Sequence, residues 1–243
     1  MIEVQGIFKQ YGSVTACADI SFSAYPGEVT ALLGPNGAGK TTILKILSGA
    51  LYPDSGEVVI QGFSMKDSPL EAKKNTGWIF ENPMLYDEFT VTENLSFIAG
   101  MHGFQKIEVK NAVARVLQTC SLEGVSSRII RGLSKGFKQR IGLAQALIHD
   151  PPVLILDEPT SGLDPVQLEE FRVLIRRIAK DKTILLSTHI MHEVELLCTR
   201  FLMLHKGHLI EQGTIADICR RTSARNIEGA FMVLASNEKG VER

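Results

Sequence analysis

The chain has 243 residues, of which 44% are hydrophobic and 22% are charged, and its formal net charge at pH 7 is -1. This length and composition are typical of a globular protein, either one α/β domain with an inserted subdomain or two domains, and they exclude a disordered or fibrous chain. Because the net charge is close to zero, no nucleic-acid partner is expected, and any anion that the chain binds must be held by a local site.

Short β-favouring runs alternate with turn residues over residues 2–60, which predicts an antiparallel β region. Within this region, the apolar run at residues 29–33 is expected to form a strand. A glycine-rich loop follows it, and a helix is then expected from Lys40 to about Ser48. A strand, a glycine-rich loop and a helix in this order form the context in which a phosphate-binding loop occurs.

The glycine-rich loop runs from Gly34 to Lys40 and Thr41 and fits the pattern G-x-x-x-x-G-K-[ST]. Glycine allows backbone N–H groups to turn toward phosphate oxygens, and the N-terminus of the following helix adds a partial positive charge. We expect Lys40 to reach the β- and γ-phosphates of ATP and the Thr41 hydroxyl to bind Mg²⁺. The predicted nucleotide-binding residues of this loop are Gly34, Pro35, Asn36, Gly37, Ala38, Gly39, Lys40, Thr41 and Thr42.

A helical pattern replaces the β pattern over residues 90–150. Apolar residues recur there at i, i+4, i+7 and i+8, namely at Val109, Val113, Val116 and Leu117. A further helical run extends from about residue 137 to residue 148. We interpret residues 90–150 as an inserted helical subdomain.

Strands and helices alternate after Pro151 and Pro152, which argues for a parallel sheet. The expected elements are a buried strand at residues 153–156, a helix with an apolar face over 171–178, a strand at 183–187 and a hairpin over 201–211. The tail beyond the hairpin is weakly patterned apart from an apolar patch at residues 230–234.

Two adjacent carboxylates, Asp157 and Glu158, follow the apolar strand at residues 153–156. Such a strand carries them to the carboxyl edge of the sheet, beside the phosphate loop. We expect Asp157 to hold Mg²⁺, directly or through water, and Glu158 to orient and deprotonate the water that attacks the γ-phosphate. Two solvated acids at a strand end are the alternative, and the phosphate loop in the same chain argues against it.

The segment L-S-K-G-F-K-Q-R, which begins at Leu133, resembles the signature motif of the ABC (ATP-binding cassette) ATPase family. Other motifs stand in the family's order: Tyr11 ahead of the phosphate loop, a D-loop-like segment ending at Asp164, and His189 after the strand at residues 183–187. The chain is similar to ATP-binding subunits of ABC transporters, most of all to bacterial exporter-type (ABC-2-like) subunits. The resemblance implies an α/β P-loop NTPase core with an N-terminal antiparallel β region and an inserted helical subdomain.

The resemblance also implies a head-to-tail dimer that buries two ATP molecules, each bound by one subunit's phosphate loop and the other's signature motif. The signature residues in trans would be Ser134, Lys135, Gly136 and Phe137. Tyr11 would stack on adenine, with an ordinary edge aromatic as the alternative. His189 would contact the γ-phosphate, with a structural histidine as the alternative. Asp164 would bridge the dimer, and a helix N-cap is its competing role.

Three positions depart from the family pattern. Lys135 and Phe137 stand where the family most often has glycine and glutamine. Glu81 stands where a glutamine is expected. A carboxylate at this position can still face Mg²⁺, but it adds a negative charge near the γ-phosphate and accepts hydrogen bonds where an amide would also donate them.

The predicted organisation is one ABC ATPase domain over residues 1–243. Its parts are residues 1–82 with the β region and phosphate loop, residues 83–150 with the helical subdomain and signature motif, residues 151–215 with the second part of the core, and residues 216–243 as a short tail. The four cysteines are scattered, without a CxxC pair or a signal-peptide pattern, which predicts reduced thiols in the cytosol. No apolar run approaches the roughly 18 to 20 residues that a membrane-spanning helix needs.

The resemblance favours an ATP hydrolase that powers a membrane transporter, held at the inner face of the cell membrane by a separate integral membrane permease. A second ATP-binding subunit is expected, and one set of motifs is compatible with a homodimer or a heterodimer. A soluble ABC ATPase that remodels a protein complex is the alternative. A catalytically poor regulator is a third possibility, but Lys40, Thr41, Asp157, Glu158 and His189 are all present, which argues against it.

Overall fold

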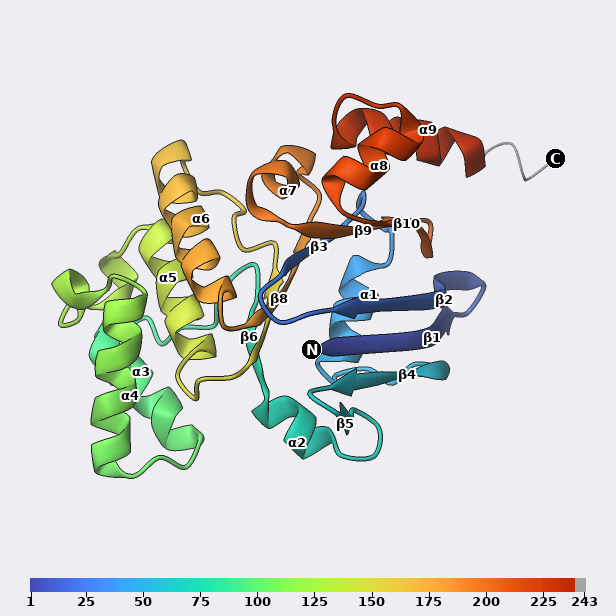
Figure 1. Cartoon of the computed structure of the whole chain (residues 1–243). Coiled ribbons are helices and arrows are strands. Elements are labelled where there is room, and N and C mark those ends of the chain that lie inside the picture. The colour runs from blue at the N-terminus through green and yellow to red at the C-terminus, as the bar shows by residue number, and fades with distance from the viewer. Residues whose placement is uncertain (239–243) are drawn as a thin grey trace.

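Two sheets organise the structure, a computed structural model that describes residues 1–238. The first sheet is antiparallel, with four strands in the order β2-β1-β4-β5. Its strands are β1 (Ile2–Tyr11), β2 (Val14–Ala24), β4 (Ser55–Ile60) and β5 (Phe63–Ser64). The antiparallel β region expected near the N-terminus is therefore present, and Figure 1 shows it at the blue end of the chain, on the opposite side of the molecule from α3 and α4.

The second sheet has six strands in the order β10-β9-β3-β8-β7-β6. The strands are β3 (Val29–Leu33), β6 (Thr76–Ile79), β7 (Val153–Asp157), β8 (Thr183–Thr188), β9 (Arg200–His205) and β10 (His208–Gly213). Every pairing from β9 to β6 is parallel, and β10 pairs antiparallel with β9 at the edge. The assignment of residues 29–33 to the antiparallel region is wrong, because β3 pairs in parallel with β8 and β9. All five residues of β3 are buried, as in a strand that is covered on both faces.

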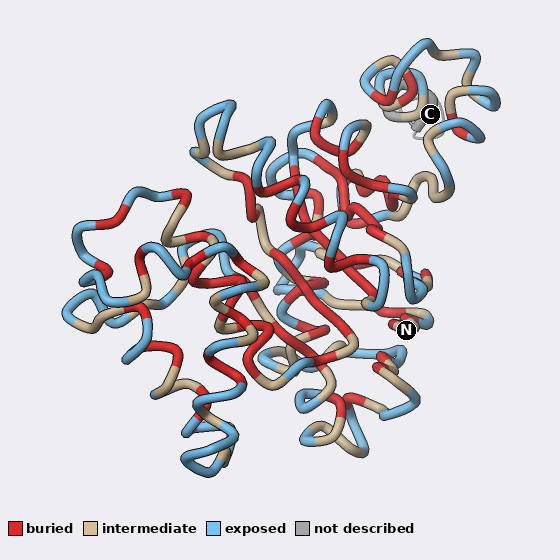
Figure 2. Tube along the Cα trace, turned by 60° about the vertical axis from the view of Figure 1, so that its left-hand side comes forward, coloured by how far each residue is buried: buried red, intermediate tan, exposed pale blue. Residues whose placement is uncertain are grey.

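The two faces of the second sheet belong to two separate apolar cores. Along β7, Leu154 and Leu156 join the core on one face, whereas Val153 and Ile155 join the core on the other. This alternation follows from the two-residue period of a strand. Figure 2 shows buried segments running through the middle of the molecule and on into the helices.

Helix α1 (Lys40–Leu47) directly follows the phosphate loop and packs between the two sheets. Its side chains Ile43, Leu44, Ile46 and Leu47 are buried there. Because α1 is fixed on both sides, the loop that precedes it is fixed as well.

Helices α3 (Val91–Met101), α4 (Lys106–Thr119) and α5 (Lys135–Ala146) form the helical subdomain, grouped beside the second sheet in Figure 1. Short 3-10 turns at Glu123–Val125 and Ile130–Gly132 connect α4 to α5. The helices expected within residues 90–150 are present. Helix α5 begins two residues earlier than residue 137, because the Ser134 side chain caps its N-terminus.

Five further helices complete the described chain: α2 (Pro69–Lys74), α6 (Pro165–Ala179), α7 (Met191–Leu197), α8 (Ile215–Thr222) and α9 (Ile227–Glu238). The last two lie within the tail, where the sequence predicts only an apolar patch. Ile218, Ile227 and Ala230 anchor them in the core. The remaining residues of the tail, 239–243, lie outside the described residues.

Two histidine rings stack where α3 and α5 end, His102 against His149, with centroids 4.1 Å apart. Burial, aided by the nearby His102, lowers the pKa of His149 to about 4. Between pH about 6.5 and 4, the unfolded chain therefore binds a proton that the folded chain does not, so the free energy of unfolding should decrease as the pH falls.

We expect His149 to contribute about 1 to 2 kcal/mol to the loss of stability between pH 7 and pH 4. This is less than the whole pKa shift would give, because the ring is partly exposed to solvent. Urea unfolding at the two pH values measures the loss. His149→Gln should make the loss smaller, whereas His208→Gln, at an exposed position of β10, should leave it unchanged. An equal loss in the unaltered chain and in His149→Gln would contradict the prediction.

Candidate active site

An open pocket of about 410 Å³ lies at the carboxyl ends of β3, β7 and β8. Its lining comes from the start of β2, from the phosphate loop after β3 and from residues that end or follow β6, β7 and β8. The lining residues are Val14, Thr15, Ala16, Pro35, Asn36, Gly37, Ala38, Gly39, Lys40, Thr41, Thr42, Glu81, Asp157, Glu158 and His189. The structure thus brings together the predicted phosphate loop, both predicted acids, Glu81 and His189.

Two glycines of the phosphate loop have no room for a side chain. A Cβ on Gly34 would lie 2.6 Å from the carbonyl oxygen of Leu204 in β9. A Cβ on Gly39 would lie 2.4 Å from the carbonyl oxygen of Ala16 in β2, and Gly39 also has a φ of +109°. The loop is therefore clamped between two strands, with Lys40 directly behind it as the first residue of α1.

The Lys40 ammonium group is folded into the loop. Its Nζ donates to the carbonyl oxygens of Gly34 at 2.6 Å and of Pro35 at 3.3 Å, and it lies 4.0 Å from Oε1 of Glu158. Burial lowers the pKa of Lys40, and the charges of Glu158 and Asp157 oppose that effect. The pocket therefore contains a lysine ammonium group, held by two loop carbonyls and Glu158, at the place where the loop would bind phosphate.

Ser187 fixes the two acids at the end of β7. It lies opposite Asp157 in the parallel pairing of β7 with β8, and its Oγ donates to Oδ1 of Asp157 at 2.6 Å. The backbone N–H of Glu158 donates to the same hydroxyl at 3.0 Å. Sequence reasoning missed this serine, because its role depends on which strand lies beside β7.

The carboxylate of Glu158 faces the imidazole of His189, with Oε2 3.0 Å from Nδ1. The Glu158 side chain is largely buried and the His189 side chain is half exposed, at 15% and 49%. Glu158 has a positive φ of 44°, an uncommon conformation for a residue with a side chain, so the surrounding contacts must hold it there. The sequence predicted the two residues separately, and the structure places them in direct contact.

Glu81 connects the pocket to the helical subdomain. Its Oε1 accepts a hydrogen bond from the Ser161 hydroxyl at 3.1 Å, and its backbone carbonyl accepts one from Nε2 of Gln139 at 3.1 Å. Gln139 is buried in α5, the helix that begins with the signature residues. Ser161 and Gln139 belong to the D-loop-like and signature segments, but their contacts with Glu81 were not predicted, since each meets it only through the tertiary fold.

Tyr11 is exposed at the end of β1 and is not among the residues that line the pocket. Lys9 places its Nζ 5.8 Å from the centre of the Tyr11 ring. The neighbouring wall of the pocket is instead built by residues 14–16 at the start of β2. Stacking of Tyr11 on adenine stays a prediction.

The signature residues do not line the pocket of their own chain. Ser134 caps α5, since its Oγ accepts from the N–H of Phe137 at 3.4 Å, and Gly136 lies against the side chain of Gln167.

Asp164 caps α6: its Oδ1 accepts from the N–H groups of residues 166 and 167 at 3.0 and 2.9 Å. Asp164 therefore has the N-cap role that was its alternative, and its bridging role stays a prediction. The roles of residues 134–137 in binding ATP also stay predictions.

Thr41, Asp157 and Glu81 form a set of oxygen donors that fits Mg²⁺, which prefers hydroxyl and carboxylate ligands. Over residues 1–238, no group of three or more His, Cys, Asp or Glu side chains could hold a metal ion by itself. A nucleotide-bound Mg²⁺ does not require one, because phosphates and water supply most of its ligands.

Comparison with known proteins bears on the identity of this site. The family model for the ABC transporter (ABC_tran) matches residues 17–161. The chain is 36% identical over 221 residues to the ABC transporter ATP-binding protein NatA of Bacillus subtilis, covering 90% of each. It is 38% identical over 214 residues to the bacitracin transport ATP-binding protein BcrA of Bacillus licheniformis, covering 87% of this chain and 69% of that protein.

Solved structures agree in fold. One, described as the ATP-binding subunit of an ABC transporter, has 33% identity and a TM-score of 0.85 and covers 97% of this chain and 99% of its own. Another, CbiO1 of Clostridium perfringens, described as part of the ABC transporter complex CbiONQ, has 28% identity and a TM-score of 0.81 and covers 95% of this chain and 97% of its own. None of the helices described over residues 1–238 combines the length and the hydropathy of a membrane-spanning segment. The phosphate loop, the paired acids and these relatives together show that the chain belongs to the ABC transporter ATP-binding family and is an ABC ATPase.

Proposed function

We propose that the chain powers a membrane exporter by binding and hydrolysing ATP in a head-to-tail dimer of ATP-binding subunits. The observation that carries this proposal is the meeting of Lys40, Glu158 and His189 in one pocket beneath the phosphate loop. A cation can bind phosphate, a carboxylate can accept a proton from the attacking water, and an imidazole beside that carboxylate can orient it.

Each group has one role in the proposed reaction. The loop N–H groups and Lys40 bind the β- and γ-phosphates, and Glu158 accepts a proton from the attacking water. His189 keeps Glu158 oriented and contacts the γ-phosphate. Thr41, Asp157 and Glu81 would hold Mg²⁺, which offsets the charge of the phosphate oxygens when it is bound.

The position of the signature residues supports the dimer. Because residues 134–137 lie away from their own pocket, they can reach an ATP molecule only if it is bound to another subunit. Ser134 caps α5, and Gly136 adds no side chain to its first turn. The N-terminus of α5 would therefore place N–H groups against the γ-phosphate. ATP would then join the two subunits, and hydrolysis would release them.

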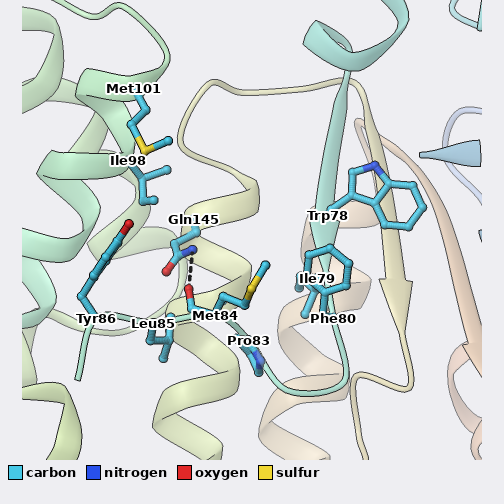
Figure 3. A pocket seen from close by; sticks show the side chains of 11 residues that line it. Trp78, Ile79, Phe80, Pro83, Met84, Leu85, Tyr86, Ile98, Met101 and Gln145 are labelled. Carbon is cyan, nitrogen blue, oxygen red and sulfur yellow. Dashed lines mark hydrogen bonds between the residues drawn. The ribbon is translucent and has the colours of Figure 1, made fainter. Parts of the chain in front are cut away.

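An apolar groove of about 420 Å³ supports the membrane partner. It is lined by the end of β6, the segment that follows it and helices α3 and α5. Figure 3 shows Tyr86, Ile98 and Met101 on one side and Trp78 and Phe80 on the other. Met84 and Met101 are 74% and 69% exposed at its rim. Contiguous exposed apolar side chains mark a surface that another protein covers, and we assign this groove to the permease.

The groove is connected to the ATP pocket through residues 81–86. Glu81 lines the pocket, whereas residues 83–86 line the groove. Side chains of the helical subdomain hold this segment: Gln145 Nε2 donates to the carbonyl oxygen of Met84 at 3.4 Å, and Asn94 Oδ1 accepts from the N–H of Tyr86 at 3.1 Å. A shift of the helical subdomain on ATP binding would therefore move the wall of the groove.

The test is to purify the tagged chain from gently solubilised membranes and identify what accompanies it. We expect one multi-spanning membrane protein to co-purify with the chain in about equal amount. It should no longer co-purify with Met84→Glu, because this variant puts a charge into the apolar groove. Leu70→Glu is the matched control, because Leu70 is equally exposed, at 73%, but lies on α2 outside the groove. Recovery with soluble partners alone would contradict the permease assignment and favour a complex-remodelling ATPase.

A further inference from the structure

A buried carboxylate lies directly behind the pair formed by Glu158 and His189. Glu193, in α7, is only 6% exposed. Its Oε2 accepts hydrogen bonds from the hydroxyls of Thr160 at 2.5 Å and of Thr188 at 3.3 Å. Both threonines are buried too, at 5% and 0% exposure.

The two threonines belong to the two segments that carry the reacting groups. Thr160 stands two residues after Glu158, and Thr188 directly precedes His189. Thr188 also holds the turn that leads into α7, since its Oγ1 accepts from the N–H of Ile190 at 3.0 Å. One carboxylate therefore connects the chain that follows β7 to the chain that follows β8.

A carboxylate in such a place calls for an explanation. Burying a charged group is unfavourable unless its hydrogen bonds offset the loss of water, and an apolar side chain could fill the same volume without that cost. A single oxygen of the carboxylate accepts from both hydroxyls, so it holds the two threonines at one point. The backbone of Glu158 needs such support, because its positive φ is unfavourable for a residue with a side chain.

We propose that Glu193 is a positioning residue for ATP hydrolysis, which holds Thr160 and Thr188 so that Glu158 and His189 stay in contact and aligned on the γ-phosphate. The inference rests on the roles proposed above for Glu158 and His189. Glu193 itself is not among the residues that line the pocket. It acts on the rate through the geometry of the two residues that do.

Glu193→Ala should lower kcat by about 10- to 100-fold, because a displacement of about 1 Å at a reacting group costs up to about 10²-fold. KM for ATP and the Kd of a fluorescent ATP analogue should stay within about threefold, since Lys40 and the phosphate loop are untouched. Glu195→Ala is the matched control: Glu195 lies on the same helix, but its Oε1 accepts from the N–H of Ile227 in α9. This control should change the melting temperature and not kcat.

Thr160 supplies the second arm of the test. Thr160→Val removes the hydroxyl and should lower kcat, whereas Thr160→Ser keeps it and should restore most of the rate. The double variant, Glu193→Ala with Thr160→Val, should have a kcat within about threefold of that of the slower single variant. This is expected for two residues that act through one contact. If Glu193→Ala does not fold, Thr160→Val against Thr160→Ser carries the comparison alone, since it removes or keeps the same hydrogen bond.

A kcat of Glu193→Ala within about threefold of the unaltered chain, or losses that multiply in the double variant, would overturn the inference. Glu158→Gln, assayed beside these variants, separates that failure from failure of the proposed function. If Glu158→Gln abolishes turnover and the Glu193 variants do not, only the positioning role is lost. If Glu158→Gln turns over normally, the assignment of the base fails first.

Discussion

Replacing Glu158 with glutamine should lower ATP turnover by roughly 10² to 10⁴-fold, the range that a positioned general base supplies. The amide has nearly the same size and can keep a hydrogen bond to His189, but it cannot take a proton from water. ATP affinity should be unchanged or slightly increased, because the exchange removes a negative charge that lies 4.0 Å from Lys40, where the phosphates are expected to bind. Steady-state phosphate release measures the first effect and equilibrium nucleotide binding the second.

The same variant tests the dimer. If ATP joins two subunits and hydrolysis separates them, Glu158→Gln should stay dimeric with ATP and Mg²⁺, as seen by size-exclusion chromatography with light scattering. Adding Ser134→Ala should weaken that dimer, because it removes the cap that fixes the N-terminus of α5. Glu57→Gln, at an exposed position of β4, is the control that should change neither turnover nor assembly. Normal turnover in Glu158→Gln would show that another group acts as the base.

Local patterns alone predicted the phosphate loop and the paired acids, whereas Glu81 and His189 were predicted from the family resemblance. The phosphate loop lies between a strand and a helix, and Asp157 and Glu158 are adjacent at the end of an apolar strand, so their placement follows from rules of local order. Ser187 and Glu193 reach the same site only through the pairing of β7 with β8 and the packing of α7. No period or spacing in one sequence indicates which strand lies beside another.

Several short elements of the fold were not predicted either, and β6 and α9 show why. Strand β6 has only four residues and contains Gly77, which disfavours a strand by its intrinsic preference. The structure supplies the reason for this glycine, since a Cβ there would lie 2.3 Å from the carbonyl oxygen of Ala146 in α5. Helix α9 is apolar around much of its circumference, so it lacks the one-sided pattern that indicates a surface helix.

Replacing Lys40 with alanine should weaken ATP binding by roughly 10²-fold or more, since a hydrogen bond to a charged group contributes about 1.5 to 3 kcal/mol and Lys40 is expected to make two to the phosphates. The effect should exceed that of losing two contacts at an ordinary surface. Removing the Lys40 ammonium group leaves the carboxylates of Asp157 and Glu158 in the pocket without a cation beside them. The pocket itself would then repel the phosphates. Titration with a fluorescent ATP analogue measures the loss.

Lys45→Ala is the matched control, because Lys45 lies in the last turn of the same helix and is exposed to solvent. Its ATP affinity should equal that of the unaltered chain. A melting temperature for each variant separates lost binding from lost folding, which matters because Lys40 also donates to the carbonyl oxygens of Gly34 and Pro35. Lys40→Arg sharpens the result: it keeps the charge, but the planar guanidinium presents its donors as a rigid fork and not from one compact ammonium group, so binding should still fall. Unchanged ATP affinity in a folded Lys40→Ala would mean that the loop binds phosphate through its backbone alone, and the charge-based account of this pocket would be wrong.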